Sequence, residues 1–157
     1  MTDERAPILM NMPGQLRFSK DGRWFHEEVE FTHEKIRDYF SRHFHFHPAL
    51  DKYVVEVDGK CIPVIVEDTS VVIRSLDTRT IPWTAILGNG AHEPFRAETL
   101  SVTAEPVYYS LAQNGERARL LGAAVQALLP FVVEREDGIF VLKSGPNEHV
   151  IAVQTTR

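Results

Sequence analysis

The fold of this chain is decided by residues 53–76, YVVEVDGKCIPVIVEDTSVVIRSL, in which three apolar runs are separated by short polar stretches. The first two runs flank Asp58-Gly59, a dipeptide that favours the positive φ angles of a two-residue hairpin turn. A turn at that dipeptide predicts three cross-strand pairs: Val57 with Lys60, Val55 with Ile62 and Tyr53 with Val64. One face of this hairpin would be almost wholly apolar, and a third strand would follow Thr69-Ser70. We expect the rest of the chain to cover these three strands.

The composition is that of an ordinary globular protein, with 157 residues, 43% hydrophobic and 25% charged. This length suits one core or two small, closely packed halves. A net charge of -5 without any basic run argues against nucleic-acid binding, which rests on clustered Lys and Arg. The single cysteine, Cys61, excludes an internal disulfide. Because the sequence also shows no secretory signal and no apolar segment of membrane-spanning length, we expect a cytoplasmic protein that is not anchored to a membrane.

The N-terminal part of the chain predicts a hairpin and then a helix. The expected elements are a flexible lead-in over 1–14, strands at 16–18, 23–26 and 29–31, and a helix after Thr32 as its N-cap. The helix rests on five residues at helical spacing: Ile36, Tyr39, Phe40, His43 and Phe44. Pro48 would end it, because the residue before a proline is pushed out of helical geometry.

The C-terminal part predicts a second helix-and-strand arrangement. The expected elements are strands at 81–87 and 95–104, helices at 106–112 and 116–129, and strands at 139–143 and 150–154. In each half a helix precedes an apolar hairpin, which begins near Asp51 in one and near Asp137 in the other. Chance is the alternative, since this arrangement is common. The sequence therefore predicts an α+β fold of internally duplicated helix-plus-antiparallel-hairpin units in one compact body, with halves at 15–66 and 67–157.

His43, His45 and His47 lie in the segment HFHFH, and closely spaced imidazoles are common zinc ligands. In a strand all three would share one face, but His43 already completes the helical stripe, and Pro48 prevents the helix from carrying His47 onward. No CxxC, HxxE or HxHxD pattern lies nearby to complete a metal site. Histidines at a frayed helix end, with the intervening phenylalanines buried, are the favoured interpretation, and a metal site is the alternative.

Acidic and aromatic residues supply the other candidates. Glu67 and Asp68 end the second apolar run, where they could act as acid and base or accept hydrogen bonds from a ligand; Asp68 could instead cap the following turn. Trp24 is either a core anchor or a stacking platform for a planar ligand. On a helix at 106–112, Tyr108 would be buried and Tyr109 would be the freer phenol. The sequence contains no nucleophile elbow, phosphate-binding loop or dinucleotide fingerprint.

Several segments occur in an order and spacing that point to one family. They are residues 21–26 (DGRWFH), the helix with Phe40, Tyr53, residues 65–69 (IVEDT) and residues 106–111 (PVYYSL). Over roughly residues 15–112 the chain resembles the bacterial domain of unknown function 1285 family. The resemblance implies a duplicated α+β core, a C-terminal part similar to pleckstrin-homology folds, a nucleotide-like ligand between the halves, and a signalling role. The chain departs from the family at Thr69-Ser70-Val71, where Ala-Pro-Phe is usual, and in its predicted helix at 116–129.

The leading interpretation is a non-enzymatic, ligand-sensing domain for a planar, anionic small molecule. Its candidate site residues are Arg23, Trp24, Glu67, Asp68, Arg74 and Tyr109. Aromatic rings would stack on the ligand, and guanidinium groups would hold its anionic part. We expect no cofactor, nucleic acid or membrane partner, and a homodimer stays open. Two other functions stay open: a metal-dependent hydrolase using His43, His45 and His47, and a protein-interaction module without a small ligand.

Overall fold

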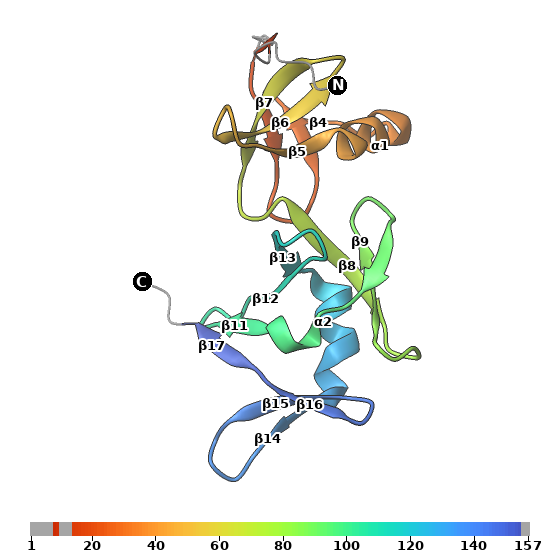
Figure 1. Ribbon diagram of the computed structural model, residues 1–157, viewed down its shortest axis with the longest axis vertical. Coiled ribbons are helices and arrows are strands. Elements are labelled where there is room, and N and C mark those ends of the chain that lie inside the picture. The colour runs from red at the N-terminus through yellow and green to blue at the C-terminus, as the bar shows by residue number, and fades with distance from the viewer. Residues whose placement is uncertain (1–7, 10–13, 155–157) are drawn as a thin grey trace. The chain divides into compact units, whose positions relative to one another are not determined.

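The computed structural model describes residues 8–9 and 14–154, which form an α+β fold with mixed sheets (Figure 1). The chain divides into two compact units, with the boundary between Asp68 and Thr69. We call them the N-terminal and the C-terminal unit. Residues 53–76 are therefore not one central element, because their first two strands belong to the N-terminal unit and the third to the C-terminal unit. Within the described residues, no helix has the length and apolar character needed to cross a bilayer.

The hairpin at Asp58-Gly59 forms as the sequence predicts. Strand β6 (Lys52–Val57) pairs antiparallel with β7 (Lys60–Val66), and the register joins Val57 to Lys60 and Val55 to Ile62. Both turn residues have positive φ, 53° at Asp58 and 77° at Gly59. The hairpin is buried on both faces, since the adjacent residues Val54 and Val55 are both fully buried. The sequence predicted a single apolar face.

The N-terminal unit holds a mixed sheet in the order β4-β3-β2-β7-β6-β5, and β1 also pairs with β7 in parallel. The remaining elements are β1 (Ile8–Leu9), β2 (Leu16–Phe18), β3 (Trp24–His26), β4 (Val29–Glu30), α1 (Glu34–Arg42) and β5 (Phe44–His47). Of the expected lead-in at 1–14, residues 1–7 and 10–13 lie outside the described residues. The core centres on Trp24, which packs against the rings of Phe18, Phe40 and Phe44 at centroid distances of 4.9 to 5.6 Å.

The expected limits of the first helix were wrong at both ends. Helix α1 has His33 as its N-cap, without a side-chain capping bond, so Thr32 is not the cap. The helix ends at Arg42, and the next residues form β5, which pairs antiparallel with β6. Pairing with β6 thus prevails over the helical spacing of His43 and Phe44. Of the predicted stripe, Phe40 contacts the Trp24 ring, whereas Ile36 and Tyr39 are each 40% exposed.

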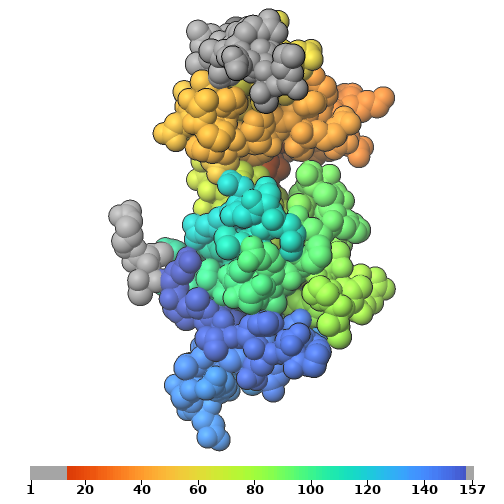
Figure 2. All heavy atoms as spheres, viewed as in Figure 1, coloured from red at the N-terminus to blue at the C-terminus, as the bar shows by residue number. Residues whose placement is uncertain are grey.

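The C-terminal unit holds a mixed sheet in the order β10-β9-β8-β13-β12-β11-β17 and a separate antiparallel sheet, β14-β15-β16. The sheet strands are β8 (Val71–Asp77), β9 (Thr84–Leu87), β10 (His92–Pro94), β11 (Ser101–Thr103), β12 (Tyr108–Leu111), β13 (Arg117–Leu120) and β17 (Ala152–Gln154). The other elements are η1 (Ala97–Thr99), α2 (Gly122–Leu128), η2 (Leu129–Phe131), β14 (Val132–Glu134), β15 (Phe140–Ser144) and β16 (Asn147–Val150). Helix α2 buries Ala124 and Leu128 in the core of this unit, whereas the turn between β14 and β15 protrudes (Figure 2).

Four expectations for the C-terminal unit were wrong. The expected strand at 95–104 is η1 followed by the short strand β11. Residues 106–112 do not form a helix, because Tyr108–Leu111 is strand β12, hydrogen-bonded between β11 and β13. The expected helix at 116–129 is strand β13 followed by the shorter helix α2. The expected strand at 150–154 is interrupted at the buried residue Ile151, after which β17 leaves β15 and β16 to pair with β11.

The two larger sheets share a strand order. In the N-terminal unit, two groups of three strands meet where β2 pairs with β7 in parallel; in the C-terminal unit, they meet where β8 pairs with β13 in parallel. Helix α1 and the short η1 lie at the same place in this order, after the third strand. The duplication expected from the sequence, in which a helix precedes a hairpin in each half, would instead match α1 with α2. Helix α2 follows β13, the sixth strand of its unit, so this form of duplication is not confirmed. The likeness of the C-terminal half to pleckstrin-homology folds stays a prediction.

Candidate functional site

Polar and aromatic side chains gather on the outer face of the sheet in the N-terminal unit. Strand β2 alternates, so that Arg17 points away from the core while its two neighbours in the strand are buried. Phe25 on β3 lies opposite Arg17, and Glu30 on β4 lies opposite Phe25. The sheet therefore places one row of side chains across three strands. We call the whole set the arginine face, and it consists of Arg17, Arg23, Phe25, Glu28, Glu30 and Glu67.

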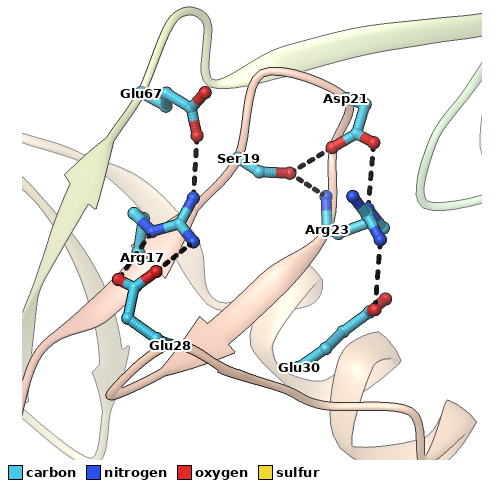
Figure 3. Close-up of polar contacts among 7 residues, drawn as sticks. All are labelled: Arg17, Ser19, Asp21, Arg23, Glu28, Glu30 and Glu67. Carbon is cyan, nitrogen blue, oxygen red and sulfur yellow. Dashed lines mark hydrogen bonds and ion pairs between the residues drawn. The ribbon is translucent and has the colours of Figure 1, made fainter.

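Arg17 is held by two carboxylates (Figure 3) and packs against an aromatic ring. Its Nε and Nη2 donate to the two carboxylate oxygens of Glu28 at 3.3 and 3.0 Å, and its Nη1 donates to Glu67 Oε2 at 2.7 Å. The guanidinium carbon lies 4.3 Å from the centroid of the Phe25 ring. The hydrogen bond to Glu28 raises the pKa of Arg17 further, so this guanidinium stays charged. Such a fork fixes the plane of the guanidinium group.

Arg23 is held by a second pair of carboxylates (Figure 3), and it approaches the same aromatic ring. Its Nε donates to Asp21 Oδ2 at 2.9 Å and its Nη1 to Glu30 Oε1 at 3.2 Å, while its guanidinium carbon lies 5.5 Å from the Phe25 centroid. The buried hydroxyl of Ser19 donates to Asp21 and accepts the backbone N–H of Arg23. Burial would raise the pKa of Asp21, but the Ser19 hydrogen bond and the Arg23 charge outweigh it and lower that pKa.

The turn that presents Glu28 is unusual for its residue types. Glu27 and Glu28 connect β3 to β4, and both have positive φ, 50° and 68°. A two-residue turn of this kind favours glycine or asparagine, because a left-handed backbone costs other residues about 1–2 kcal/mol each. In this conformation the Glu28 carboxylate reaches Arg17 from the neighbouring hairpin turn.

The structure brings together two of the six predicted ligand-binding residues, Arg23 and Glu67, on the arginine face. Trp24 is 1% exposed, and its Nε1 donates to Ser41 Oγ at 3.3 Å. A buried indole offers no free face to a ligand, so Trp24 is a core residue. Asp68, half-buried, lies at the end of the N-terminal unit.

The other two predicted residues, Arg74 and Tyr109, belong to the C-terminal unit. Arg74 is exposed on β8. Tyr109 is 7% exposed and lies under the guanidinium of Arg117, 3.7 Å from the ring centroid, whereas Tyr108 is half-buried. The expectation that Tyr109 is the freer phenol was wrong, because the segment is a strand and not a helix.

The histidine segment has a different geometry from the one expected. His43 is the C-cap of α1 and packs on Tyr39, with ring centroids 4.7 Å apart. His45 and His47 are two residues apart on β5 and leave the same face of the strand, with ring centroids 6.0 Å apart. His45 Nε2 lies 3.1 Å from Glu56 Oε1. Within residues 8–9 and 14–154, the three histidines do not form a cluster of metal-ligand atoms. The group that does cluster contains His47 with two other residues and is described below.

Sequence reasoning missed four residues of the arginine face: Arg17, Phe25, Glu28 and Glu30. The alternation of residues 16–18 was a usable signal, because it exposes Arg17 on the face opposite the core. The partners of Arg17 carried no such signal, since they lie 11 and 50 positions away in the sequence.

Comparisons with known proteins show the fold. No family model and no curated protein matches the sequence. The crystal structure of a DUF1285 family protein from Silicibacter pomeroyi DSS-3 is similar to the chain with a TM-score of 0.69 and 18% sequence identity, over 94% of this chain and 84% of that one. A DUF1285 family protein from Shewanella baltica OS155 is similar with a TM-score of 0.56 and 16% identity, over 70% of this chain and 86% of that one. The chain is therefore a remote structural relative of DUF1285 family proteins.

Proposed function

We propose that the N-terminal unit is a ligand-binding module whose arginine face holds a planar, anionic small molecule, such as a nucleotide. The observation that carries the proposal is the placement of two guanidinium groups over one ring, since Arg17 and Arg23 both lie against Phe25. Flat guanidinium groups form forked hydrogen bonds with phosphate or carboxylate and stack on aromatic rings. The lone cysteine of the sequence favours a cytoplasmic setting for this function.

The carboxylates around the arginines are compatible with this role because they can be displaced. The Glu28 side chain is 78% exposed, and Arg17 is 22% exposed. Exposed ion pairs contribute about 0–1 kcal/mol, since water competes for both partners. A ligand phosphate could therefore replace Glu28 on the Arg17 fork, and the released carboxylate would be solvated by water. Until then, Glu28 and Glu67 keep the guanidinium in place.

The test measures the binding of adenosine and guanosine phosphates to the full chain. Thermal-shift assays and isothermal titration calorimetry detect this binding. Binding to the folded state alone raises the midpoint of thermal unfolding. We expect Arg17→Gln to weaken binding at least about tenfold, because losing a charged hydrogen-bond donor removes about 1.5–3 kcal/mol. Glu28→Gln should strengthen binding, because it removes the charge that competes with the ligand anion.

The matched control is Arg135→Gln in the C-terminal unit. Arg135 also pairs with a carboxylate, Asp137, at 3.0 Å, and it is 45% exposed. This variant should bind as the wild type does. The proposal is contradicted if no nucleotide stabilises the wild type, or if Arg17→Gln and Arg23→Gln both retain full affinity.

A protein-interaction module is the second candidate, and one observation favours it. Ile65 on β7 lies opposite Arg17 in the sheet and is 45% exposed. An apolar residue beside arginine is typical of the centre of a protein interface. A self-association measured by analytical ultracentrifugation and lost in Ile65→Asp, together with no response to nucleotides, would support this candidate over the first.

A further inference from the structure

Three side chains that can ligate a metal converge on one face of the sheet in the N-terminal unit. They come from three neighbouring strands, His47 from β5, Glu56 from β6 and Cys61 from β7. The ligand atoms, one from each side chain, all lie within 4.8 Å of one another. None of these residues belongs to the arginine face.

The sheet register explains why the three side chains leave the same face. Glu56 and Cys61 are directly opposite in the β6–β7 hairpin, so their side chains leave the same face. His45 lies opposite Val54 on β6, and His47 is two residues further along β5, so both imidazoles also leave that face. His45 Nε2 lies 3.1 Å from Glu56 Oε1. Backbone pairing of three strands thus places all four side chains on one face of the sheet.

An unsatisfied polar atom gives a second, independent observation. Nδ1 of His47 is buried and has no hydrogen-bond partner, which is unusual for a ring nitrogen in a folded protein. Cys61 is fully buried in the same place. Burial and the nearby Glu56 charge both raise the pKa of the Cys61 thiol. A cation between these residues would offset the negative charge of Glu56 and accept lone pairs from the three side chains.

We propose that His47, Glu56 and Cys61 form a zinc-binding site. Imidazole nitrogen, carboxylate oxygen and thiolate sulfur are the donors that Zn²⁺ takes in proteins, whereas Mg²⁺ and Ca²⁺ favour oxygen alone. On binding, the Zn–S bond forms as the thiol S–H bond breaks, and the proton goes to solvent. His45, hydrogen-bonded to Glu56, is a positioning residue that orients this carboxylate. Three protein ligands leave a fourth position of a tetrahedral ion for water.

The site differs from the three-histidine metal site that was the alternative interpretation of the sequence. It keeps His47, replaces His43 with Glu56 and Cys61, and gives His45 an outer role. The sequence hid this set because His43 and Phe44 were assigned to the end of a helix, so the pairing of β5 with β6 was not expected. Once 44–47 is a strand beside β6, the cross-strand pairing selects these ligands.

The experiment titrates the untagged, chelator-treated full chain with Co²⁺, a spectroscopic substitute for Zn²⁺. Cys61 is the single cysteine of the chain, so a cobalt–thiolate charge-transfer band in the near ultraviolet can arise from this residue alone. We expect this band, saturating at one equivalent and abolished by one equivalent of Zn²⁺. Zn²⁺, and not Mg²⁺, should also raise the thermal unfolding midpoint.

Variants identify the ligands. Cys61→Ser should lose the band, and His47→Gln and Glu56→Gln should each weaken Co²⁺ binding about 10-fold or more, since the loss of a residue that only orients a ligand already costs about 10–100-fold. His33→Gln is the matched control, because His33 is exposed at the start of α1 and makes no capping bond. If Cys61→Ser fails to fold, Glu56→Gln decides, since that side chain is 32% exposed and its replacement keeps its size. A wild type without the band, or folded Glu56→Gln and His47→Gln variants that bind Co²⁺ as the wild type does, would overturn the proposal.

Discussion

At the scale of single residues, hydrogen-bond partners decide the charge of a titratable group. Asp77 is the strongest case, because Nε and Nη2 of Arg79 donate to its two oxygens at 3.0 Å each, and the Arg79 backbone N–H donates as well. These hydrogen bonds lower the pKa of Asp77 to about 2. Asp77 is thus a carboxylate held in its charged form by one neighbouring residue.

The depressed pKa of Asp77 makes stability depend on acid in a defined direction. The folded pKa lies below the value of about 3.9 in an unfolded chain, so the contribution is full above pH 4 and is lost as the pH falls towards 2. We expect Asp77→Asn to flatten the fall in unfolding free energy between pH 4 and pH 2, measured by urea denaturation. Asp38→Asn, which removes an exposed carboxylate on α1, is the control. Parallel curves for the wild type and Asp77→Asn would show that the pair does not couple to folding.

Residues also show what a sequence can and cannot reveal. The Asp58-Gly59 turn was predictable, because two adjacent residues carry the whole conformational signal. Two of the six residues of the arginine face, Arg23 and Glu67, were selected, but Arg17 was not, because its role depends on carboxylates brought close by the sheet. The burial of Trp24 was left open for the same reason, since only the assembled ring cluster determines it.

At the scale of elements, short apolar segments were the main source of error. Residues 43–47 and 106–112 each satisfy a helical spacing over one or two turns, a length at which helix and strand patterns overlap. Strand pairing on one or both sides determined the outcome, with β5 beside β6 and β12 between β11 and β13. Longer segments with turn signals at their ends, such as β6 and β7, were predicted well.

The β3–β4 turn gives a prediction at this scale. Replacing Glu27 with glycine should stabilise the protein by about 0.5–1 kcal/mol, because relief of about 1–2 kcal/mol of left-handed strain exceeds the extra chain entropy of glycine. Glu28→Gly relieves the same strain but removes the fork on Arg17. Its gain should therefore be smaller by the worth of an exposed ion pair, about 0.2–1 kcal/mol.

Urea denaturation of the two glycine variants measures this difference directly. The Arg17→Gln background is the control, because there the two variants should become equally stabilising. An equal gain in the wild-type background would mean that the Glu28–Arg17 pair contributes nothing to stability.

At the scale of the whole molecule, each unit has its own core. The largest buried cluster lies wholly within the C-terminal unit and includes Leu100, Leu128 and Leu142, with Trp83 packed on Phe131 at a centroid distance of 4.9 Å. The α+β class was predictable from the alternation of helical and strand patterns. The structure divides the chain between Asp68 and Thr69, near the limit between the expected halves at 15–66 and 67–157.

This independent core predicts that residues 69–157 fold alone. The fragment should give a strand-rich circular dichroism spectrum and a cooperative thermal transition, since its buried cluster is intact. The same fragment with Leu128→Ala should lose about 2–5 kcal/mol of stability, because it opens a cavity at a fully buried side chain. A fragment that melts without cooperativity would show that the core needs the preceding residues.

The parallel pairing of β2 with β7 and of β8 with β13 affects how the chain folds during synthesis. The N-terminal sheet closes by joining Leu16 to Val64, and the C-terminal sheet by joining Val71 to Ala118. Such distant contacts form late and slowly, because a long loop must close before they contribute any stabilisation. On the ribosome, β2 and β3 must therefore remain without their β7 partner until almost the entire first unit has emerged. That interval exposes an unpaired strand edge, the state in which a nascent chain is most prone to aggregate and most in need of a chaperone.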